Sequence, residues 1–340
     1  MNRSKQSSLP INDQFDPTRI SLRLSVTEKC QLRCCYCMPE PVRHDDNSLP
    51  PLSKEEIRQV IGSLQSYYRI SKLQLTGGDP LVRADLGEII KSLSCEQIPD
   101  ISLTTNGQAL KQWAKRLQES GLNRMNISLD SIDRDRFRRI TKTGDLHKTI
   151  EGIEAAIEQK MQPVKLNTVV MRGVNEEEIA DIADFGLSRG CQVRFLELMP
   201  IGAASRRFET LYVSSSEVKT RLSREFHFSP LPDSPASSSV NYTVVSKTGL
   251  TGVIGFISPY SAPFCSRCNR LRLTSSGRFV GCLKLGNSID IRSILESESP
   301  STDRLIVEAA KKVLSQKQNA AVSSNTSSFQ SKEIMAAIGG

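Results

Sequence analysis

ISLRLSVTEKCQLRCCYC, residues 20–37, joins an apolar stretch of alternating pattern to three cysteines spaced C-x3-C-x2-C. The alternation over Ile20–Val26 predicts a β-strand. Three thiolates do not fill the four-ligand shell of a structural zinc ion, but they suit three irons of a 4Fe–4S cluster and leave the fourth iron open. An open iron can bind a small molecule and pass it one electron. We therefore interpret Cys30, Cys34 and Cys37 as ligands of a reactive cluster, with a zinc knuckle completed by a distant residue as the alternative.

Strand-like segments alternate with helix-like segments from residue 20 to about residue 200. Ser53 and Glu56 form a capping box that predicts a helix to about Tyr68, and Asn175 with Glu178 predicts the start of another. Six strand–helix repeats predict an α/β fold, a partial (incomplete) TIM barrel of about six βα units. We expect a C-terminal α+β extension to cover the lateral opening. The candidate strands are Ile20–Val26, Lys72–Thr76, Asp100–Thr105, Arg124–Asp130, Val164–Met171 and Gln192–Leu198.

Four of the other predicted strands end in polar or glycine-rich motifs. Parallel strands bring their carboxyl ends to one rim, where folds of this class place their active sites, so we expect the site there. A Gly-Gly-Asp-Pro turn is by itself more often structural than functional, and its interpretation depends on the cysteines about 40 residues before it. The motifs are Gly77-Gly78-Asp79-Pro80, Thr105-Asn106-Gly107, Ser128-Leu129-Asp130 and Glu197-Leu198-Met199-Pro200.

A second group of three cysteines, Cys265, Cys268 and Cys282, again lacks a fourth ligand. The chain has only three histidines, so histidine does not readily complete this group. Arg270 and Arg272 lie between these cysteines on one face of an extended segment, which suits bidentate binding of phosphate. A zinc ribbon with its fourth ligand elsewhere is the alternative.

Arg23 lies on the strand face opposite to Leu22 and Leu24. If the apolar face packs against helices, the guanidinium points into the barrel, where it needs a carboxylate or a ligand phosphate as its partner. The chain has no G-x-x-x-x-G-K-[ST] loop, so a bound nucleotide would be held by scattered arginines and lysines.

The chain of 340 residues has a net charge of +8, which favours anionic partners, either nucleic acid or a polyphosphate metabolite. Nine cysteines, six of them in two tight groups, indicate metal binding in a reducing compartment. No stretch is long and apolar enough for a membrane span, and the first nineteen residues lack the apolar centre of a secretory signal. We expect no membrane association and a cytoplasmic location, or the mitochondrial matrix if the host is eukaryotic.

The composition changes near residue 235, where the chain becomes rich in proline and serine. We expect a core domain over residues 14–235 and a C-terminal domain over residues 236–340 that carries the second cysteine group. Residues 301–314 predict a helix, and the polar residues 315–332 predict a mobile tail, which ends in Gly339 and Gly340.

These residues resemble the radical S-adenosylmethionine (radical SAM) enzymes, and most closely the GTP 3′,8-cyclase (molybdenum cofactor biosynthesis protein A) family. The resemblance runs from residue 21 to the final Gly-Gly, and FCSRCNRLRLT at residues 264–274 is its most specific stretch. It implies a lyase with two 4Fe–4S clusters, one on each cysteine group, and S-adenosylmethionine as cosubstrate. A 5′-deoxyadenosyl radical would take the C3′ hydrogen of the GTP ribose, and the carbon radical would attack C8 of guanine. The product, (8S)-3′,8-cyclo-7,8-dihydroguanosine 5′-triphosphate, begins molybdenum cofactor biosynthesis.

The resemblance also implies roles for single residues and partners. Gly339 and Gly340 match a tail that reaches into the active site, where a residue without a Cβ suits a narrow entry. The implied partners are a flavodoxin- or ferredoxin-like electron donor and cyclic pyranopterin monophosphate synthase, which takes the product; a monomer or homodimer without nucleic acid is expected. Tyr36, Gly78, Ser128 and Met199 match S-adenosylmethionine contacts, and Arg23, Gln74, Thr104, Lys165, Arg270 and Arg272 match GTP contacts.

Several positions depart from the family pattern. The family usually has arginine where this chain has Gln74, and loss of a charge-assisted contact to phosphate costs roughly 1.5–3 kcal/mol. We therefore predict that Gln74→Arg tightens GTP binding, unless Lys72 on the same strand face substitutes. Asp79 replaces the usual glutamate, and the tail carries Lys332–Met335 where arginine and methionine are common.

Two other hypotheses stay open. The first is a divergent radical SAM paralogue that acts on another substrate. The second is a zinc-organised basic protein that binds nucleic acid. That hypothesis leaves the rim motifs unexplained, and aromatic residues, which stack on bases, make up only 5% of the chain.

Overall fold

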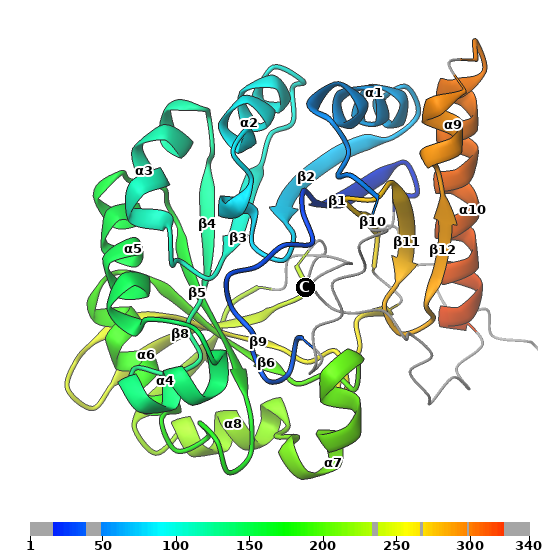
Figure 1. Ribbon diagram of the computed structural model, residues 1–340. Coiled ribbons are helices and arrows are strands. Elements are labelled where there is room, and N and C mark those ends of the chain that lie inside the picture. The colour runs from blue at the N-terminus through cyan, green and yellow to red at the C-terminus, as the bar shows by residue number, and fades with distance from the viewer. Residues whose placement is uncertain (1–15, 39–48, 233–236, 266–267, 298, 323–340) are drawn as a thin grey trace, which may run out of the picture.

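The computed structural model describes residues 16–38, 49–232, 237–265, 268–297 and 299–322. A twelve-stranded sheet in the order β12-β11-β10-β1-β2-β3-β4-β5-β6-β9-β8-β7 curves around the interior, and helices cover its outer side (Figure 1). The strands are β1 (Arg19–Ser25), β2 (Arg69–Thr76), β3 (Ile101–Thr105), β4 (Arg124–Ser128), β5 (Val164–Val170), β6 (Gln192–Glu197), β7 (Phe226–Pro230), β8 (Val240–Ser246), β9 (Thr251–Ile257), β10 (Arg270–Leu273), β11 (Arg278–Cys282) and β12 (Asn287–Asp290). The helices are α1 (Lys54–Gln65), η1 (Pro80–Val82), α2 (Leu86–Ser94), α3 (Leu110–Glu119), α4 (Arg134–Thr141), α5 (Leu146–Glu158), α6 (Ile179–Ser188), η2 (Gly202–Arg207), α7 (Phe208–Leu211), α8 (Ser215–Leu222), α9 (Arg292–Glu296) and α10 (Thr302–Val322).

The middle of the sheet is parallel. β1 to β6 pair in sequence order, β10 joins β1 and β9 joins β6, all in parallel. The outer strands β11, β12, β8 and β7 pair antiparallel. The two end strands, β12 and β7, do not pair with each other, so the sheet is unclosed. The predicted α/β class with a mostly parallel sheet is confirmed.

The segment after β7 supplies strands to both edges of this sheet. β8 and β9 extend the edge beside β6, and the chain then crosses to the other edge and enters β10 beside β1. An apolar cluster of Ile201, Val280 and Leu283, with Met199 packed against it, joins the segment after β6 to β11. These strands lie in opposite halves of the strand order, so the cluster ties the two halves together.

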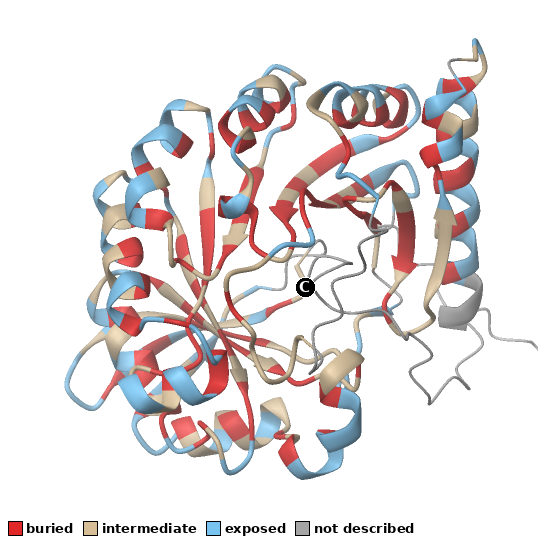
Figure 2. Cartoon of the chain, viewed as in Figure 1, coloured by how far each residue is buried: buried red, intermediate tan, exposed pale blue. Residues whose placement is uncertain are grey.

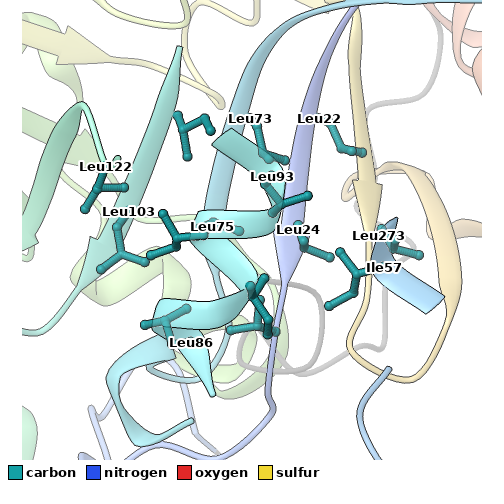
Figure 3. Close-up of a cluster of buried hydrophobic side chains, with 14 of the residues drawn as sticks. Leu22, Leu24, Ile57, Leu73, Leu75, Leu86, Leu93, Leu103, Leu122 and Leu273 are labelled. Atoms are coloured by element: carbon teal, nitrogen blue, oxygen red, sulfur yellow. The ribbon is translucent and has the colours of Figure 1, made fainter. Parts of the chain in front are cut away.

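Each central strand buries one apolar face under the helices. Leu22 and Leu24 of β1 and Leu73 and Leu75 of β2 have no exposed surface, and Figure 3 shows them beside side chains of α1 and α2. Burial of one such leucine contributes roughly 1.5–3 kcal/mol. Buried segments follow the strands and the inner sides of the helices (Figure 2). The opposite face of each strand is polar and faces the interior.

Of the two predicted helix starts, one is confirmed. The Ser53 hydroxyl accepts the Glu56 N–H (3.1 Å) and the Glu56 carboxylate accepts the Ser53 N–H (2.6 Å), as a capping box requires. The second prediction is wrong: the Asn175 side chain accepts the Met171 N–H (2.7 Å), and the Glu178 carboxylate accepts N–H groups after β4. Unpaired donors of a neighbouring loop have displaced the local cap.

α10 extends eight residues beyond the predicted helix end, to Val322. Its buried side chains include Ile306, Ala310 and Val313, and it packs against α1, β11 and β12. Part of the segment predicted to be a mobile tail is therefore helical, because the helix gains an apolar surface to pack on. Gly339 and Gly340 lie outside the described residues. No helix in the described part of the chain has the length and apolar character needed to cross a bilayer.

Candidate active site between two cysteine groups

The first cysteine group lies in the loop that follows β1. The Cys34 carbonyl accepts the N–H groups of Cys37 (3.0 Å) and Met38 (3.1 Å), which forms a tight turn. Burial raises the pKa of Cys34 well above its ordinary value, and Asp130, Cys37 and Cys30 raise it further by their proximity. The turn therefore brings the three predicted ligands near one another in a partly buried place.

Tyr36 ties this loop to the end of β4. Its hydroxyl donates to Asp130 Oδ2 at 2.6 Å, and Asp130 Oδ1 accepts the Val169 N–H at 2.9 Å. Burial raises the pKa of Asp130 to about 6, although both hydrogen bonds favour the carboxylate. The side chain of Tyr36, predicted as a cosubstrate contact, thus has a structural partner at the end of β4.

Asp79 joins the rim loops of β2 and β3. Its carboxylate accepts the N–H of Leu81 (2.9 Å), the hydroxyl of Thr105 (2.8 Å) and the N–H of Asn106 (2.7 Å). The side chain is 1% exposed, and burial raises its pKa to about 6. The Asn106 amide in turn approaches the Cys30 sulfur at 3.6 Å. Asp79 thereby positions a group that contacts a predicted cluster ligand.

The two glycines before Asp79 permit a backbone-to-backbone approach. A Cβ on Gly77 would lie 2.5 Å from the Thr27 carbonyl oxygen, and one on Gly78 would lie 2.4 Å from that of Lys29. The Gly78 N–H donates to Thr27 at 2.8 Å. Any larger residue would push away the start of the cysteine loop, so the glycines support that loop whatever else they contact.

The second cysteine group lies beside cations. Burial raises the pKa of Cys268, but Lys317 and Arg270 act more strongly together and leave it below its ordinary value. Lys317, a buried residue of α10, also donates to the Arg270 carbonyl at 2.8 Å. Burial and the neighbouring thiols of Cys282 and Cys268 raise the pKa of Cys265, so these three cysteines are neighbours as well.

The two groups lie at opposite ends of the same pair of strands. β1 and β10 run in parallel with Arg23 opposite Arg272. The first group follows the carboxyl end of β1, whereas Cys268 precedes β10 and Cys282 ends the antiparallel β11. A seven-residue strand such as β1 is roughly 20 Å long. The first cysteine group thus lies at the same rim as the strand-end motifs, and the second lies at the other end of these strands.

A chain of polar side chains crosses the interior between the two groups. Arg23 Nε donates to Gln74 Oε1 (3.3 Å), and Gln74 Nε2 donates to Thr104 Oγ1 (2.6 Å). Asn126 Nδ2 reaches the same hydroxyl at 3.4 Å, and Arg194 donates to Asn126 Oδ1 at 3.4 Å. These residues come from β1, β2, β3, β4 and β6, so one connected row lines the inner face of the sheet.

The cations along this row lower one another's pKa values. Burial lowers the pKa of Lys165 to about 7, and Arg194, Arg124 and Lys72 lower it further. Burial and Arg270 lower the pKa of Arg272 to about 9. A buried group of like charges is unfavourable until an anion joins it. The interior therefore suits a polyanionic ligand.

The remaining predicted site residues that the structure describes lie outside this row of polar side chains. Ser128 ends β4 opposite Asn167, and Met199 packs on the Ile201 cluster. Arg270 lies 5.7 Å from the Phe264 ring centre, as a cation–π pair. Gly339 and Gly340 are not among the described residues. A surface hollow lined by Asp181 and other residues of α6 and the β8–β9 turn contains none of the predicted site residues.

Sequence reasoning missed three residues of the site. Arg194 alternates with buried Val193 and Phe195, so the period-two argument that identified Arg23 also applies to it. Asp130 belongs to the predicted rim motif Ser128-Leu129-Asp130, but the sequence alone predicts no role for it. No pattern in the sequence points to Lys317, because only the packing of α10 brings it near Cys268.

Comparisons with known proteins agree with this arrangement. The Radical SAM superfamily model matches residues 24–186, and the Molybdenum Cofactor Synthesis C model matches residues 191–322. The GTP 3′,8-cyclase of Moorella thermoacetica is 41% identical over 299 residues, 86% of this chain and 90% of that protein. That of Alkaliphilus metalliredigens is 40% identical over 282 residues, 83% of this chain and 86% of that protein.

Among solved structures, the SuiB protein of Streptococcus suis bound to S-adenosylmethionine has a similar fold. Its TM-score is 0.55 at 13% identity, over 86% of this chain and 66% of that one, so this chain spans just under two thirds of SuiB. That likeness shows the fold alone. The relatives at about 40% identity extend over nearly the whole of both chains, and the chain therefore belongs to the GTP 3′,8-cyclase family of radical SAM enzymes.

Proposed function

We propose that this chain converts GTP to (8S)-3′,8-cyclo-7,8-dihydroguanosine 5′-triphosphate, the first step of molybdenum cofactor biosynthesis. The observation that carries the proposal is the group of buried cations between two cysteine groups. Arg23, Lys165 and Arg272 each have a pKa lowered by burial and by other cations, which a triphosphate would relieve. Family membership supplies the reaction, and this interior offers a place for its substrate.

The cofactors are two 4Fe–4S clusters, with S-adenosylmethionine as cosubstrate. No three His, Cys, Asp or Glu side chains of the described residues are already arranged as a metal site, but each cysteine group supplies three thiols for a cluster. The thiols of the first group are all partly buried, whereas the second group has two partly buried thiols and the exposed Cys265. The Cys30 sulfur accepts the Leu32 N–H at 3.3 Å and lies 3.6 Å from the Asn106 amide, and such contacts stabilise cluster thiolates. When bound, the first cluster and the cosubstrate supply a 5′-deoxyadenosyl radical.

The roles we propose for the chain's residues follow their places. Cys30, Cys34 and Cys37 hold the first cluster, and Cys265, Cys268 and Cys282 hold the second. Arg23, Lys165, Arg270 and Arg272 bind the triphosphate as cations, while Gln74 and Thr104 orient Arg23 through their hydrogen bonds. Tyr36, Gly78, Ser128 and Met199 contact S-adenosylmethionine. The tail residues Gly339 and Gly340 reach into the active site.

A water-excluding interior matters for this chemistry. A primary carbon radical takes a hydrogen atom from whatever C–H lies nearest, so substrate position decides the product. Arg272 is 5% exposed and Leu22, Leu24 and Leu271 behind it are fully buried, so the triphosphate would be held on a rigid wall. We propose that this rigidity keeps the ribose in one orientation.

The finer organisation is also a proposal. We infer a partial TIM barrel of about six βα units over residues 14–235 and a C-terminal domain over residues 236–340 that covers the opening. A flavodoxin- or ferredoxin-like protein would donate electrons, and cyclic pyranopterin monophosphate synthase would take the product. We propose a cytoplasmic monomer or homodimer, or a mitochondrial matrix protein in a eukaryotic host.

Anaerobic purification followed by metal analysis and an assay tests the function. We expect about eight irons per chain and, with GTP, S-adenosylmethionine and a chemical reductant, 5′-deoxyadenosine together with an oxidisable pterin precursor. About four irons and 5′-deoxyadenosine without the GTP product would favour a paralogue with another substrate. Zinc without iron would overturn the proposal in favour of the nucleic-acid-binding alternative.

A further inference from the structure

The outer side of the first cysteine loop borders an exposed basic surface. The loop, residues 28–38, lies between α4 and the η2–α7 segment; in Figure 1 the blue segment after β1 runs toward α7, with α4 on its other side. We call five exposed cations the basic border: Arg138, Arg139 and Lys142 at the carboxyl end of α4, and Arg206 and Arg207 at the end of η2.

Backbone hydrogen bonds fix the loop to α4. The N–H groups of Arg33 and Cys35 donate to the carbonyls of Thr141 (3.0 Å) and Ile140 (2.9 Å). The Thr143 hydroxyl donates to the Gln31 carbonyl at 2.7 Å. The carboxyl end of α4, including Lys142, is therefore directly continuous with the cysteine loop.

Apolar packing fixes the loop to the second flank. Cys35 and Tyr36 pack against a buried cluster that includes Ile140, Ala204 and Phe208. Arg207 directly precedes Phe208, and both Lys142 and Arg207 lie close enough to act electrostatically on the Cys35 thiol. The two cationic segments thus meet around the residue between two predicted cluster ligands.

The cations of the basic border have no ion-pair partner among the described residues. Neighbouring arginines that face other directions do: Arg136 pairs with Glu178 at 2.8 Å and Arg172 pairs with Glu217 at 2.7 Å. The exposed acids on the same elements are Asp133, Asp135 and Glu209, with Asp145 at the start of α5, and two of these cap helices. Five cations beside few acids leave a positive surface over the cysteine loop.

We propose that the basic border docks an acidic one-electron carrier protein of the flavodoxin or ferredoxin class. This rests on the proposed function, because the first cluster must receive an electron from outside. One electron would leave the reduced flavin or iron–sulfur centre of the carrier and reduce a cluster held by Cys30, Cys34 and Cys37; the carrier would be oxidised by one electron and no atom would be transferred. Charge complementarity steers such short-lived complexes and raises their association rate.

The position of the border suits electron transfer. Cys35 is adjacent in sequence to Cys34, so a protein bound on the border lies against the backbone that holds a cluster ligand. Arg23 and Arg272, which we propose bind GTP, lie within the paired strands β1 and β10 and are not part of the border. A carrier can therefore dock and leave without disturbing bound GTP.

The test compares two double charge reversals in the full-length holoenzyme. Lys142→Glu with Arg207→Glu alters the border, and Lys91→Glu with Lys115→Glu makes the same change in net charge on exposed residues of α2 and α3. Stopped-flow absorbance follows reduction of the first cluster by purified flavodoxin hydroquinone, and equilibrium titration measures carrier affinity, each at low and high salt. Photoreduced 5-deazariboflavin, a reductant without net charge, serves as the small-molecule comparison.

We expect the border variant to bind flavodoxin at least about tenfold more weakly and to be reduced correspondingly more slowly at low salt, with the difference shrinking as salt rises. Reduction by deazariboflavin and GTP turnover with it stay unchanged, and the α2–α3 variant behaves like the parent. Equal flavodoxin affinity in both variants would overturn the proposal. Failure of the parent to use GTP with deazariboflavin would instead refute the proposed function.

Discussion

The two ends of the interior hold the same number of thiols in opposite electrostatic surroundings. At the first group, the buried carboxylates Asp79 and Asp130 add to burial and raise the pKa values of Cys30 and Cys34. At the second group, Lys317 and Arg270 outweigh burial and lower the pKa of Cys268. Cysteine spacing alone therefore says little about the behaviour of the site that the cysteines form.

The difference has a functional meaning under the proposed reaction. Negative charge near a cluster disfavours its reduced state, and positive charge nearby favours it. The first cluster, which must give an electron away, would lie at the acidic end. The second would lie at the cationic end, where the triphosphate is also expected. The charge difference thus separates electron delivery from substrate binding along one set of strands.

The largest expected effect comes from removing one ligand at either end. Cys34→Ser and Cys268→Ser should each reduce iron from about eight to about four per chain, because a cluster held by two thiolates is lost. Cys34→Ser should abolish cleavage of S-adenosylmethionine, whereas Cys268→Ser should retain slow cleavage without the GTP product. Iron analysis and chromatography of 5′-deoxyadenosine measure both. Loss of cleavage in both variants would show that the two ends do not have separate roles.

A substitution of Lys317 tests whether nearby cations set the charge state of the second cysteine group. Lys317→Met removes a buried charge-assisted contact of roughly 1.5–3 kcal/mol, which corresponds to a rise of about one to two units in the pKa of Cys268. We expect loading of the second cluster to fall near pH 7 and to recover near pH 8.5, measured as iron content after reconstitution. Lys312→Met, an exposed residue of the same helix, is the control. Equal loading at both pH values would show that Lys317 does not set the charge at this end.

Lys165 should make GTP binding depend on pH. Its pKa of about 7 in the free protein means that it is mostly neutral above pH 7.5. The triphosphate favours the charged form, so binding must take up a proton there, and the dissociation constant should rise up to about tenfold per pH unit between pH 7.5 and 9. Calorimetric titration with GTP in the absence of reductant measures this. Lys165→Met should bind more weakly and lose the slope; a slope that persists would assign it to another group.

Gln74 gives the smallest expected effect. Gln74→Arg adds a cation facing the triphosphate but breaks the hydrogen bonds that link Arg23 to Thr104. We still expect tighter GTP binding, by up to about tenfold, because a charge-assisted contact exceeds a neutral hydrogen bond. Gln74→Leu, which breaks the same bonds without a charge, is the control and should weaken binding. If both variants bind GTP with the same affinity, the side chain at position 74 does not contribute to GTP binding.

Most of the strand boundaries and the inward direction of Arg23 follow from local pattern. Period-two alternation is a property of neighbouring residues, so Ile20–Val26 indicates both a strand and its polar face before any packing is known. The same holds for the capping box at Ser53 and for the spacing of the two cysteine groups. The family resemblance rests on those short motifs.

The sequence by itself thus determined the α/β class, the six cysteines grouped in threes and the cations that face inward. Tertiary structure alone decided that the cysteine groups lie at opposite ends of β1 and β10, that Asp79 and Asp130 are near one and Lys317 is near the other, and that Glu178 binds a loop after β4 instead of capping α6. The physical reason is range: strand alternation acts over a few residues, whereas burial, electrostatic coupling and competition for hydrogen-bond donors depend on which distant segments the fold brings together.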